Sequence, residues 1–382
     1  MVEWKTIDDI SKNVFAGGTP STKHEEYYDG DIPWIRSGEI DFNTITKAER
    51  NITKEGYNNS SAKLIRSGSV VMAMTGATVA KSAIVEFETS ANQSVCAIET
   101  DESVANYKYV YFYLSKEYFK IKSSAQGALT SLNLSMIKQI EIPIPSLEEQ
   151  TRIVGILDTF TSAIDNLKEQ IAQRRKQYEY YRDQLLDLEG KEGVEIAPLR
   201  RIVKSYCTGA TPNKGHLEYY ESGTIPWLRT QDVKFNEIYE IDSFVTEEAV
   251  AKTGVKWIPA NCVIVAISGA TAGRCAINKI PTTTNQHCLN LEINPKKALY
   301  KYVYYCVYNA YSDMISKKQG ARGDLNSSII LGITIPVPSL SEQQRIVSIL
   351  DTFEASIQNL EAQLSQREKQ YEYYRNKLLS FE

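Results

Sequence analysis

The stretch IPIPSLEEQTRIVGILDTF, residues 142–160, decides the fold because it returns almost unchanged as IPVPSLSEQQRIVSILDTF at residues 335–353. Fifteen of its 19 positions are identical at a shift of 193 residues. QYEYYRDQLLDLE, from Gln177, recurs as QYEYYRNKLLSFE, from Gln370, at the same shift. Similarity at one fixed period marks an internal repeat. The chain therefore consists of two copies of a unit of about 190 residues.

Shorter motifs upstream keep nearly the same register. GGTP at 17–20 matches GATP at 209–212, and IPWIR at 32–36 matches IPWLR at 225–229. The pairs continue with TGAT at 75–78 and SGAT at 268–271, NQ at 92–93 and 285–286, and QG at 126–127 and 319–320. Each copy is thus a variable body followed by a well-preserved tail.

The tails have the pattern of long helices. Ser146 with Glu149, and Ser339 with Glu342, form capping boxes that satisfy free backbone donors at a helix start. Apolar residues then recur at steps of four and three, which is a heptad seam and predicts coiled-coil packing. Each seam contains one arginine, Arg174 or Arg367, whose predicted role is to fix the register or to meet an acidic group of a partner.

A heptad seam is also typical of an ordinary core or of a homodimer, so pairing within the chain needs an argument. A helix of about 40 residues is roughly 60 Å long, whereas a body of about 150 residues spans only about 40 Å. The second body starts where the first helix ends and cannot reach back to begin a parallel helix. Pairing within the chain must therefore be antiparallel, which gives the chain an approximate two-fold axis.

The predicted domains are body 1 at 1–145, a spacer helix at 146–189, body 2 at 190–338 and a spacer helix at 339–382. Each body has the pattern of a mixed α/β (α+β) domain. Short apolar strands surround the two Gly-Ala-Thr turns, at 69–74 with 83–87 and at 262–267 with 275–277. Aromatic stretches at 107–121 and 300–315 have helical spacing, and their tyrosines are predicted to belong to the core.

Composition excludes several classes of protein. The 382 residues include no apolar run long enough to cross a membrane and no signal peptide pattern at the N-terminus. Six cysteines without a CxxC pair indicate a reducing, cytoplasmic setting, and no metal-ligand spacing is present. His24 and His216 lie in corresponding loops but are predicted to occupy unmatched surface positions.

No catalytic constellation recurs in the two copies. Gly76–Ser82 only approaches a P-loop, because Lys81 stands where that pattern needs a glycine, and the second copy, Gly269–Cys275, has no lysine. The repeated loops contain Gly, Thr, Asn, Gln, Arg and Lys, which hydrogen-bond well but suit neither acid–base nor nucleophilic chemistry. The loops therefore favour recognition over catalysis.

Duplex DNA suits two inverted readers on a fixed spacer, because its backbone has local two-fold symmetry and a constant pitch. The net charge of −4 opposes this only as an average. Summed by segment, the helices carry −5 and the bodies +1, with −3 on body 1 and +4 on body 2. Phosphate contacts supply much of the affinity for DNA, and bodies with a summed charge of +1 are weakly equipped to make them. The chain is therefore predicted to need a basic partner.

Together these motifs resemble the specificity (S) subunit of type I restriction–modification enzymes over the whole chain. The P-x-P-S-L-x-E-Q helix start, present twice, is the strongest element of the resemblance. It implies two target-recognition domains that each read one half of a split, asymmetric DNA sequence, and two antiparallel helices that set the unread gap. It further implies docking of two methyltransferase subunits and of motor–nuclease subunits, to which S-adenosylmethionine, ATP and Mg²⁺ belong. No catalytic residue and no cofactor are expected in this chain.

The resemblance implies DNA-facing candidates in both bodies. In body 1 they are Gly18, Thr19, Trp34, Arg36, Thr75, Gly76, Lys81, Asn92, Gln93 and Gln126. In body 2 they are Thr211, Lys214, Trp227, Arg229, Ser268, Gly269, Arg274, Gln286, Gln319 and Arg322. Arg200 and Arg201 are further candidates because they stand opposite Asp8 and Asp9 of the first copy. The tryptophans, beside prolines, are also typical packing residues, and bases are expected to be read where the copies differ. Partner contacts, helix capping or both are expected of Glu149, Gln150, Arg152, Glu342, Gln343 and Arg345, and partner contacts are also expected of the seam residues Arg174 and Arg367.

Two other readings of the sequence stay open. The first is a coiled-coil scaffold whose bodies bind proteins, which predicts no DNA selectivity in any complex. The second is an enzyme with an unfamiliar site, which the duplicated polar loops without a catalytic constellation disfavour.

Overall fold

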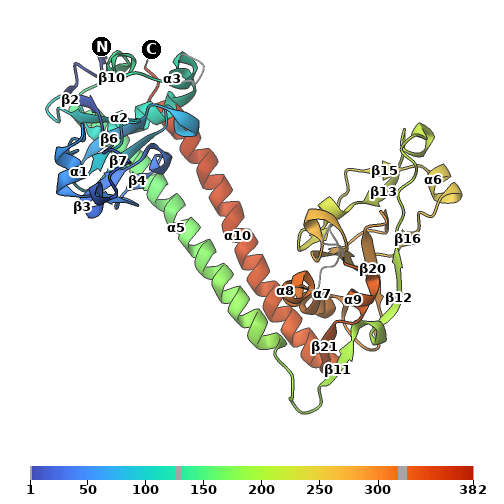
Figure 1. Ribbon diagram of the computed structural model, residues 1–382. Helices are drawn as coiled ribbons and strands as arrows, with labels where there is room; N and C mark the ends of the chain where they lie inside the picture. Colours follow the sequence, from blue (N-terminus) through green and yellow to red (C-terminus); the bar gives the residue numbers. More distant parts are fainter. Residues whose placement is uncertain (1, 126–130, 317–324, 382) are drawn as a thin grey trace. The chain divides into compact units, whose positions relative to one another are not determined.

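The computed structural model describes residues 2–125, 131–316 and 325–381, which form two compact units (Figure 1). Unit 1 is Met1–Lys168 with Ala362–Glu382, and unit 2 is Glu169–Glu361. Each unit therefore contains one body, the beginning of the long helix that follows it, and the end of the other long helix. The predicted domain boundaries fall at the helix starts, whereas the compact units divide within the helices.

Body 1 is a mixed α/β domain built on a five-stranded sheet. Its strands are β1 (Glu3–Thr6), β2 (Ser11–Ala16), β3 (Tyr28–Ile35), β4 (Thr44–Ile45), β5 (Asn51–Ile52), β6 (Ser69–Ala73), β7 (Ser82–Val85), β8 (Ser90–Ala91), β9 (Val95–Thr100) and β10 (Glu141–Ile144). Its helices are α1 (Lys54–Asn58), α2 (Tyr107–Lys116), α3 (Tyr118–Ser124) and α4 (Leu134–Lys138). The sheet orders are β2-β9-β6-β7-β4, β5-β3-β8 and β1-β10.

The core of unit 1 lies on both faces of the five-stranded sheet. Strand β6, SVVMA, is buried at every position, as expected of a short apolar strand at the centre of a sheet. On one face Val70 and Met72 pack with the aromatic helix α2, which Asn106 caps by accepting a hydrogen bond from Lys108 N (2.9 Å). On the other face Val71 and Ala73 pack in a second cluster. The predicted aromatic core is confirmed, because Tyr109 and Phe112 are buried in it.

Body 2 repeats this architecture. Its strands are β11 (Glu195–Pro198), β12 (Val203–Thr208), β13 (Ile225–Leu228), β14 (Asn236–Ile238), β15 (Phe244–Val245), β16 (Trp257–Ile258), β17 (Val263–Ala266), β18 (Cys275–Asn278), β19 (Thr282–Thr284), β20 (Cys288–Ile293) and β21 (Thr334–Val337). Its helices are α6 (Glu247–Lys252), α7 (Tyr300–Asn309), α8 (Tyr311–Ser316) and α9 (Ser327–Leu331). The sheet orders are β12-β20-β17-β18-β14, β15-β13-β19-β16 and β11-β21.

The two tails are continuous helices, α5 (Leu147–Leu186) and α10 (Leu340–Leu378). Ser146 Oγ accepts a hydrogen bond from Glu149 N (3.3 Å), and Ser339 Oγ accepts one from Glu342 N (3.3 Å), which is the serine half of each predicted capping box. The carboxylates of Glu149 and Glu342 accept from Arg152 and Arg345. Within unit 2 the two helices run antiparallel, because Arg175 pairs with Glu361 whereas the later Tyr178 bonds to the earlier Glu354. The predicted fold class, tandem α/β domains with two long antiparallel helices, is confirmed.

None of the helices formed by the described residues is long and apolar enough to cross a membrane.

Candidate functional site

Trp34 holds the GGTP loop of body 1 in place. Its indole Nε1 donates a hydrogen bond to Gly18 O (3.0 Å), and its side chain is only 4% exposed. Gly18 is also buried, and a Cβ atom at this position would lie 2.3 Å from Ala62 N. The structure therefore gives both residues a packing role, and the Trp34 side chain is not placed to contact a large ligand.

The hydrogen-bonded contact between Trp34 and Gly18 forms a joint, and the polar residues beside this joint lie nearer the surface. Thr19 Oγ1 is hydrogen-bonded to Gln93 Oε1, and Asn92 N donates to Ile35 O (3.0 Å). Arg36 follows Ile35 directly. These contacts bring three segments that are far apart in the sequence into one loop cluster: the GGTP loop, the end of β3 and the Asn92-Gln93 pair.

Body 2 contains the same joint. Trp227 Nε1 donates to Ala210 O (3.1 Å), and the tryptophan is 7% exposed. Thr211 Oγ1 is hydrogen-bonded to Gln286 Oε1, as Thr19 is to Gln93. Because both copies keep these contacts, they maintain the shared architecture of the loops, and sequence selectivity is expected from other residues.

The two Gly-Ala-Thr turns are exposed at their glycines. Gly76 and Gly269 have φ values of +79° and +74°, which only glycine adopts without strain, and no atom lies within 4 Å of a Cβ built on either. Thr75 and Ser268 precede them and are half-buried. In body 1, Thr78 Oγ1 donates to Ser37 O (2.8 Å), so the turn lies against the segment that follows Arg36.

The predicted cations of body 1 are compensated by acidic side chains. Arg36 forms an ion pair with Glu49 (2.6 Å), and Lys81 forms one with Asp41 (2.5 Å). The Lys81 ammonium also lies 5.8 Å from the centre of the Phe42 ring. These two cations are therefore partly neutralised before any anion approaches.

Body 2 differs at the equivalent positions. Lys234 replaces Asp41 at the shift of 193, and Arg274 replaces Lys81. The hydrogen bond from Phe235 N to Cys275 O (2.9 Å) places these two cations on neighbouring segments. Within the part of the chain that the structure describes, neither Arg274 nor Arg229 forms an ion pair. Body 2 therefore presents uncompensated positive charge where body 1 has ion pairs, and sequence reasoning missed Lys234.

The remaining predicted cations lie elsewhere. Lys214 is exposed in the loop after Pro212, next to the joint. Arg200 and Arg201 are exposed on the turn Leu199–Arg201 between β11 and β12, and Arg201 pairs with Glu195 (3.3 Å). They belong to the segment that joins body 2 to the helices. Three further predictions fall outside the described residues: Gln126, Gln319 and Arg322.

A repeated histidine cluster corrects one prediction. His24 and His216 do correspond, at the shift of 192 that also relates the GGTP and GATP loops. His24 Nδ1 is 2.7 Å from Glu26 Oε1, and the ring stacks on Tyr27 at 4.7 Å. His216 makes the same contacts with the glutamate and the tyrosine that follow it, at 2.7 and 5.2 Å. The correspondence of the histidines was missed because the shift between the copies changes from 192 to 193, at one inserted residue, before Ile32.

The glutamine at the start of each long helix is buried and fully used within its own unit. Gln150 Oε1 accepts a hydrogen bond from Asn106 N (2.8 Å), and its Nε2 donates to Val104 O (3.1 Å) and Pro145 O (2.9 Å). Gln343 makes the equivalent contacts with Leu299 N and two carbonyl oxygens. This corrects the expectation of partner contacts, because both side chains join the helix to its body.

The charged residues beside these glutamines are accessible. Arg152 donates two hydrogen bonds to Glu149, at 2.7 and 2.6 Å, and both side chains are more than a third exposed. This contact holds the pKa of Glu149 below its usual value. Arg345 and Glu342 repeat the pair at 2.8 and 2.7 Å. The start of each helix therefore presents the same exposed, internally neutralised pair.

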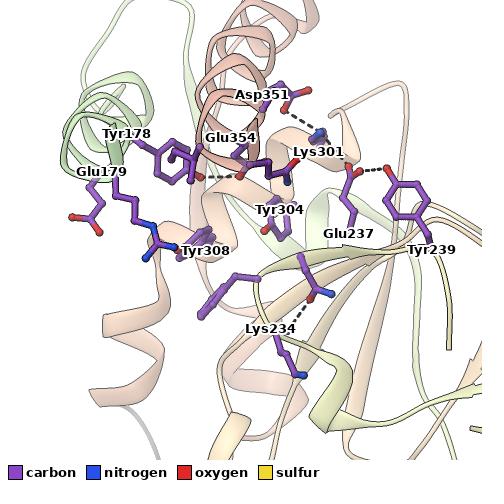
Figure 2. Close-up of a pocket in the computed structure, with 16 residues that line it drawn as sticks. Tyr178, Glu179, Lys234, Glu237, Tyr239, Lys301, Tyr304, Tyr308, Asp351 and Glu354 are labelled. Carbon is purple, nitrogen blue, oxygen red and sulfur yellow. Dashed lines mark hydrogen bonds and ion pairs between the residues drawn. The ribbon is translucent and has the colours of Figure 1, made fainter. Parts of the chain in front are cut away.

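A cavity of about 710 Å³ in unit 2 lies between body 2 and the long helices (Figure 2). Lys301, on its lining, pairs with Glu237 (3.1 Å) and Asp351 (3.0 Å), and Tyr178 OH donates to Glu354 (3.0 Å). These charges are compensated within the unit, whereas Lys234, which also lines the cavity, forms no ion pair within the described part of the chain. Among the described residues, no group of three or more His, Cys, Asp or Glu could hold a metal ion.

Comparison with known proteins identifies relatives of both copies. The family described as "Type I restriction modification DNA specificity domain" matches residues 1–174 and 191–368. A type I restriction enzyme specificity subunit of Escherichia coli is 36% identical over 317 residues, which cover 78% of this chain and 77% of that protein. A second such subunit, from Methanocaldococcus jannaschii, is 28% identical and is covered over 68% of its length.

Solved structures share the fold. The crystal structure of a type I restriction–modification S subunit from M. genitalium matches with a TM-score of 0.65 at 17% sequence identity. The match covers 100% of this chain and 97% of the other.

Proposed function

The chain belongs to the family of type I restriction–modification DNA specificity subunits, and from this premise we propose that each of its bodies reads one half of a split, asymmetric DNA target. The observation that supports this most directly is that the specificity domain matches twice, at residues 1–174 and 191–368. Two different readers on one chain imply two different half-sites. The function is recognition, and the relatives that match are themselves specificity subunits.

The loop clusters around Trp34 and Trp227 are the proposed DNA-facing parts. They combine a repeated hydrogen-bonded joint with an arginine whose pairing differs between the copies, since Arg36 pairs with Glu49 and Arg229 forms no ion pair among the described residues. Arg, Asn and Gln can read base edges, while Lys, Thr and backbone N–H groups hold phosphates. Because its cations are uncompensated, body 2 is proposed to bind the DNA backbone more strongly than body 1.

The long helices are proposed to set the gap between the half-sites and to dock two methyltransferase subunits. The exposed Glu149–Arg152 and Glu342–Arg345 pairs are the proposed contact points, because they recur at equivalent places on the two helices. Motor–nuclease subunits would join for cleavage. The chain itself is proposed to use no cofactor, with S-adenosylmethionine, ATP and Mg²⁺ used by the partner subunits.

Methylation mapping tests this function. The chain is co-purified with its methyltransferase subunit, and methylated positions are mapped on genomic DNA. We expect one split motif, and replacement of residues 1–145 by the body of another specificity subunit should change one half of it only. A matched replacement of residues 190–338 should change the other half.

The alternative function is a protein-binding scaffold, which would leave the methylated motif unchanged when either body is replaced. Retention of the whole motif in an active, body-swapped complex would therefore contradict the proposal.

A further inference from the structure

Two equivalent side-chain stacks connect α5 and α10. In unit 2 the Arg174 guanidinium lies 5.9 Å from the centre of the Phe353 ring, which stacks with Tyr181 at 5.4 Å and 27° and is in tilted contact with Tyr178 at 6.5 Å. In unit 1 Arg367 lies 5.7 Å from the Phe160 ring, which stacks with Tyr374 at 5.2 Å and 26°. Each stack takes one aromatic ring from one helix and the arginine and tyrosine from the other.

We infer that these two Arg–Phe–Tyr stacks fix the register in which α5 and α10 pair, and that Arg174 and Arg367 are therefore positioning residues for the gap in the DNA target. This inference rests on the proposed function, in which the helices set that gap. The arginines are the only charged residues among the seam positions of the two helices, whose other members are apolar or tyrosine.

The apolar part of the seam selects its register weakly. Aliphatic residues recur every heptad, so a slip of seven residues again brings aliphatic side chains opposite one another. Such a slip moves one helix by about 10 Å along the other. At that spacing Arg174 would face Ile346 or Leu360 in place of Phe353. The aliphatic seam between the helices therefore leaves the register underdetermined, and the burial of Leu379 in the core of unit 1 is a second restriction on it.

The stacks do distinguish the registers. A guanidinium is attracted to an aromatic ring only within about 6 Å of its centre, so a slip of 10 Å removes the interaction. Arg174, which is half-buried, would then also face aliphatic side chains. Arg367 is exposed, so a slip costs it the ring contact alone, because the residues seven positions either side of Phe160 are Ile153 and Leu167.

The stacks occur in both units, whereas another contact between the helices does not. In unit 2 Tyr178 bonds to Glu354, but the residue equivalent to Glu354 in unit 1 is Thr161, whose hydroxyl donates to Asp158 O (3.1 Å). A repeated device that acts on both ends of the helix pair is what a fixed spacing requires. The arginines thus meet both conditions, position in the seam and recurrence.

The test uses the complete chain assembled with methyltransferase subunits and a plasmid library of targets whose gap varies by single base pairs. In the double variant Arg174→Leu, Arg367→Leu we expect both half-sites to be read unchanged. Preference for the native gap over its neighbours should fall about tenfold, because two cation–π interactions are lost. The matched control is Lys176→Leu, Lys369→Leu, at equivalent exposed positions outside the seam, which should keep the wild-type preference.

A swapped variant guards against failure of the leucine variant to assemble. In the chain with Arg174→Phe, Phe353→Arg and the equivalent exchange Phe160→Arg, Arg367→Phe, each contact is kept with its residues exchanged. We expect the native gap preference to return. Unchanged gap preference in the leucine variant, or relaxed preference in an assembled swapped variant, overturns the inference. A wild-type complex that methylates no split motif overturns the proposed function instead.

Discussion

Glu354 is a half-buried carboxyl group at a contact between the two helices, and Thr161 is its equivalent in unit 1. It accepts a hydrogen bond from Tyr178 (α5). The other titratable groups that interact with it include Lys301, Tyr304, Tyr305 and Tyr308 (α7), Asp351 (α10) and Cys275. Burial raises the pKa of Glu354 above its ordinary value of 4.5. Unit 2 therefore carries a proton-linked contact that unit 1 lacks.

This contact makes the stability of the chain depend on pH. Because the pKa is raised on folding, the contribution of Glu354 is complete below pH 4.5 and is lost as the pH rises through the folded value. We expect Glu354→Gln to be more stable than the wild type at pH 8 by on the order of 1 kcal/mol and equal to it near pH 4.5. Chemical denaturation at both pH values measures this difference, with Ser348→Ala, exposed on the same helix, as the control.

The neighbouring carboxyl group of Glu237 affects stability in a different pH range from Glu354. Burial alone would raise the pKa of Glu237, but its hydrogen bonds with Tyr239 and Lys301 lower it. Its contribution therefore changes below pH 4.5, outside the window in which Glu354 acts. A pH profile of Glu354→Gln that parallels the wild type above pH 4.5 would contradict the prediction.

Arg274 is the residue that best tests the unequal charge of the bodies. It has no ion pair among the described residues, whereas its equivalent, Lys81, is paired with Asp41. We expect Arg274→Ala to reduce the salt dependence of DNA binding by the assembled complex by about one unit of slope, and Lys81→Ala to reduce it less. Titrations of labelled DNA between about 50 and 200 mM salt measure the slope. An equal effect of the two changes, or a loss confined to one base position, would argue against a phosphate contact.

At the scale of elements, one buried glutamine, Gln150, attaches α5 to body 1. We expect Gln150→Leu to destabilise the chain by about 2–4 kcal/mol, because Asn106 N and two carbonyl oxygens lose their partners in a buried place. Thermal unfolding should show the loss. The neighbouring exposed change Glu148→Ala should leave the midpoint nearly unchanged, and similar midpoints for the two variants would refute the assigned role.

Local sequence signals predicted the helices well and the sheets poorly. The capping serines and the heptad steps lie within one segment, so the start of α5 at Leu147 could be foreseen to within a residue. Strand order could not, because parallel pairs such as Trp34 with Ser90 and Thr44 with Ile84 join positions about 40–56 residues apart. The burial of Gln150 was equally hidden, since a glutamine in a first helical turn has the pattern of an exposed cap.

The candidate site was predictable only where the two copies agree. Repetition identified the Trp34 joint and the Gly76 turn, but the structure shows that the joint is held by buried packing. What distinguishes the copies, such as Lys234 in place of Asp41, is visible only once the strands place it beside Arg274. Comparison of aligned motifs cannot supply that adjacency.

For the whole molecule, the length of the helix pair is the quantity to vary. Deletion of one heptad from each helix, residues 165–171 and the equivalent 358–364, shortens each by about 10 Å. We expect the gap in the methylated motif to shorten by about three base pairs, with both half-sites kept, or the complex not to assemble. Methylation mapping distinguishes these results. An active complex that keeps the original gap would show that the helices do not measure it.

The composition of the units has a consequence for biosynthesis. Unit 1 includes Ala362–Glu382, and Leu379 is buried in its core, where its carbonyl oxygen accepts a hydrogen bond from Lys116 (3.2 Å). Body 1 leaves the ribosome first, yet residues that complete its core are translated after the whole of unit 2. The apolar surface that Leu379 covers therefore stays exposed on the nascent first body for most of the time of synthesis, during which a chaperone can bind there.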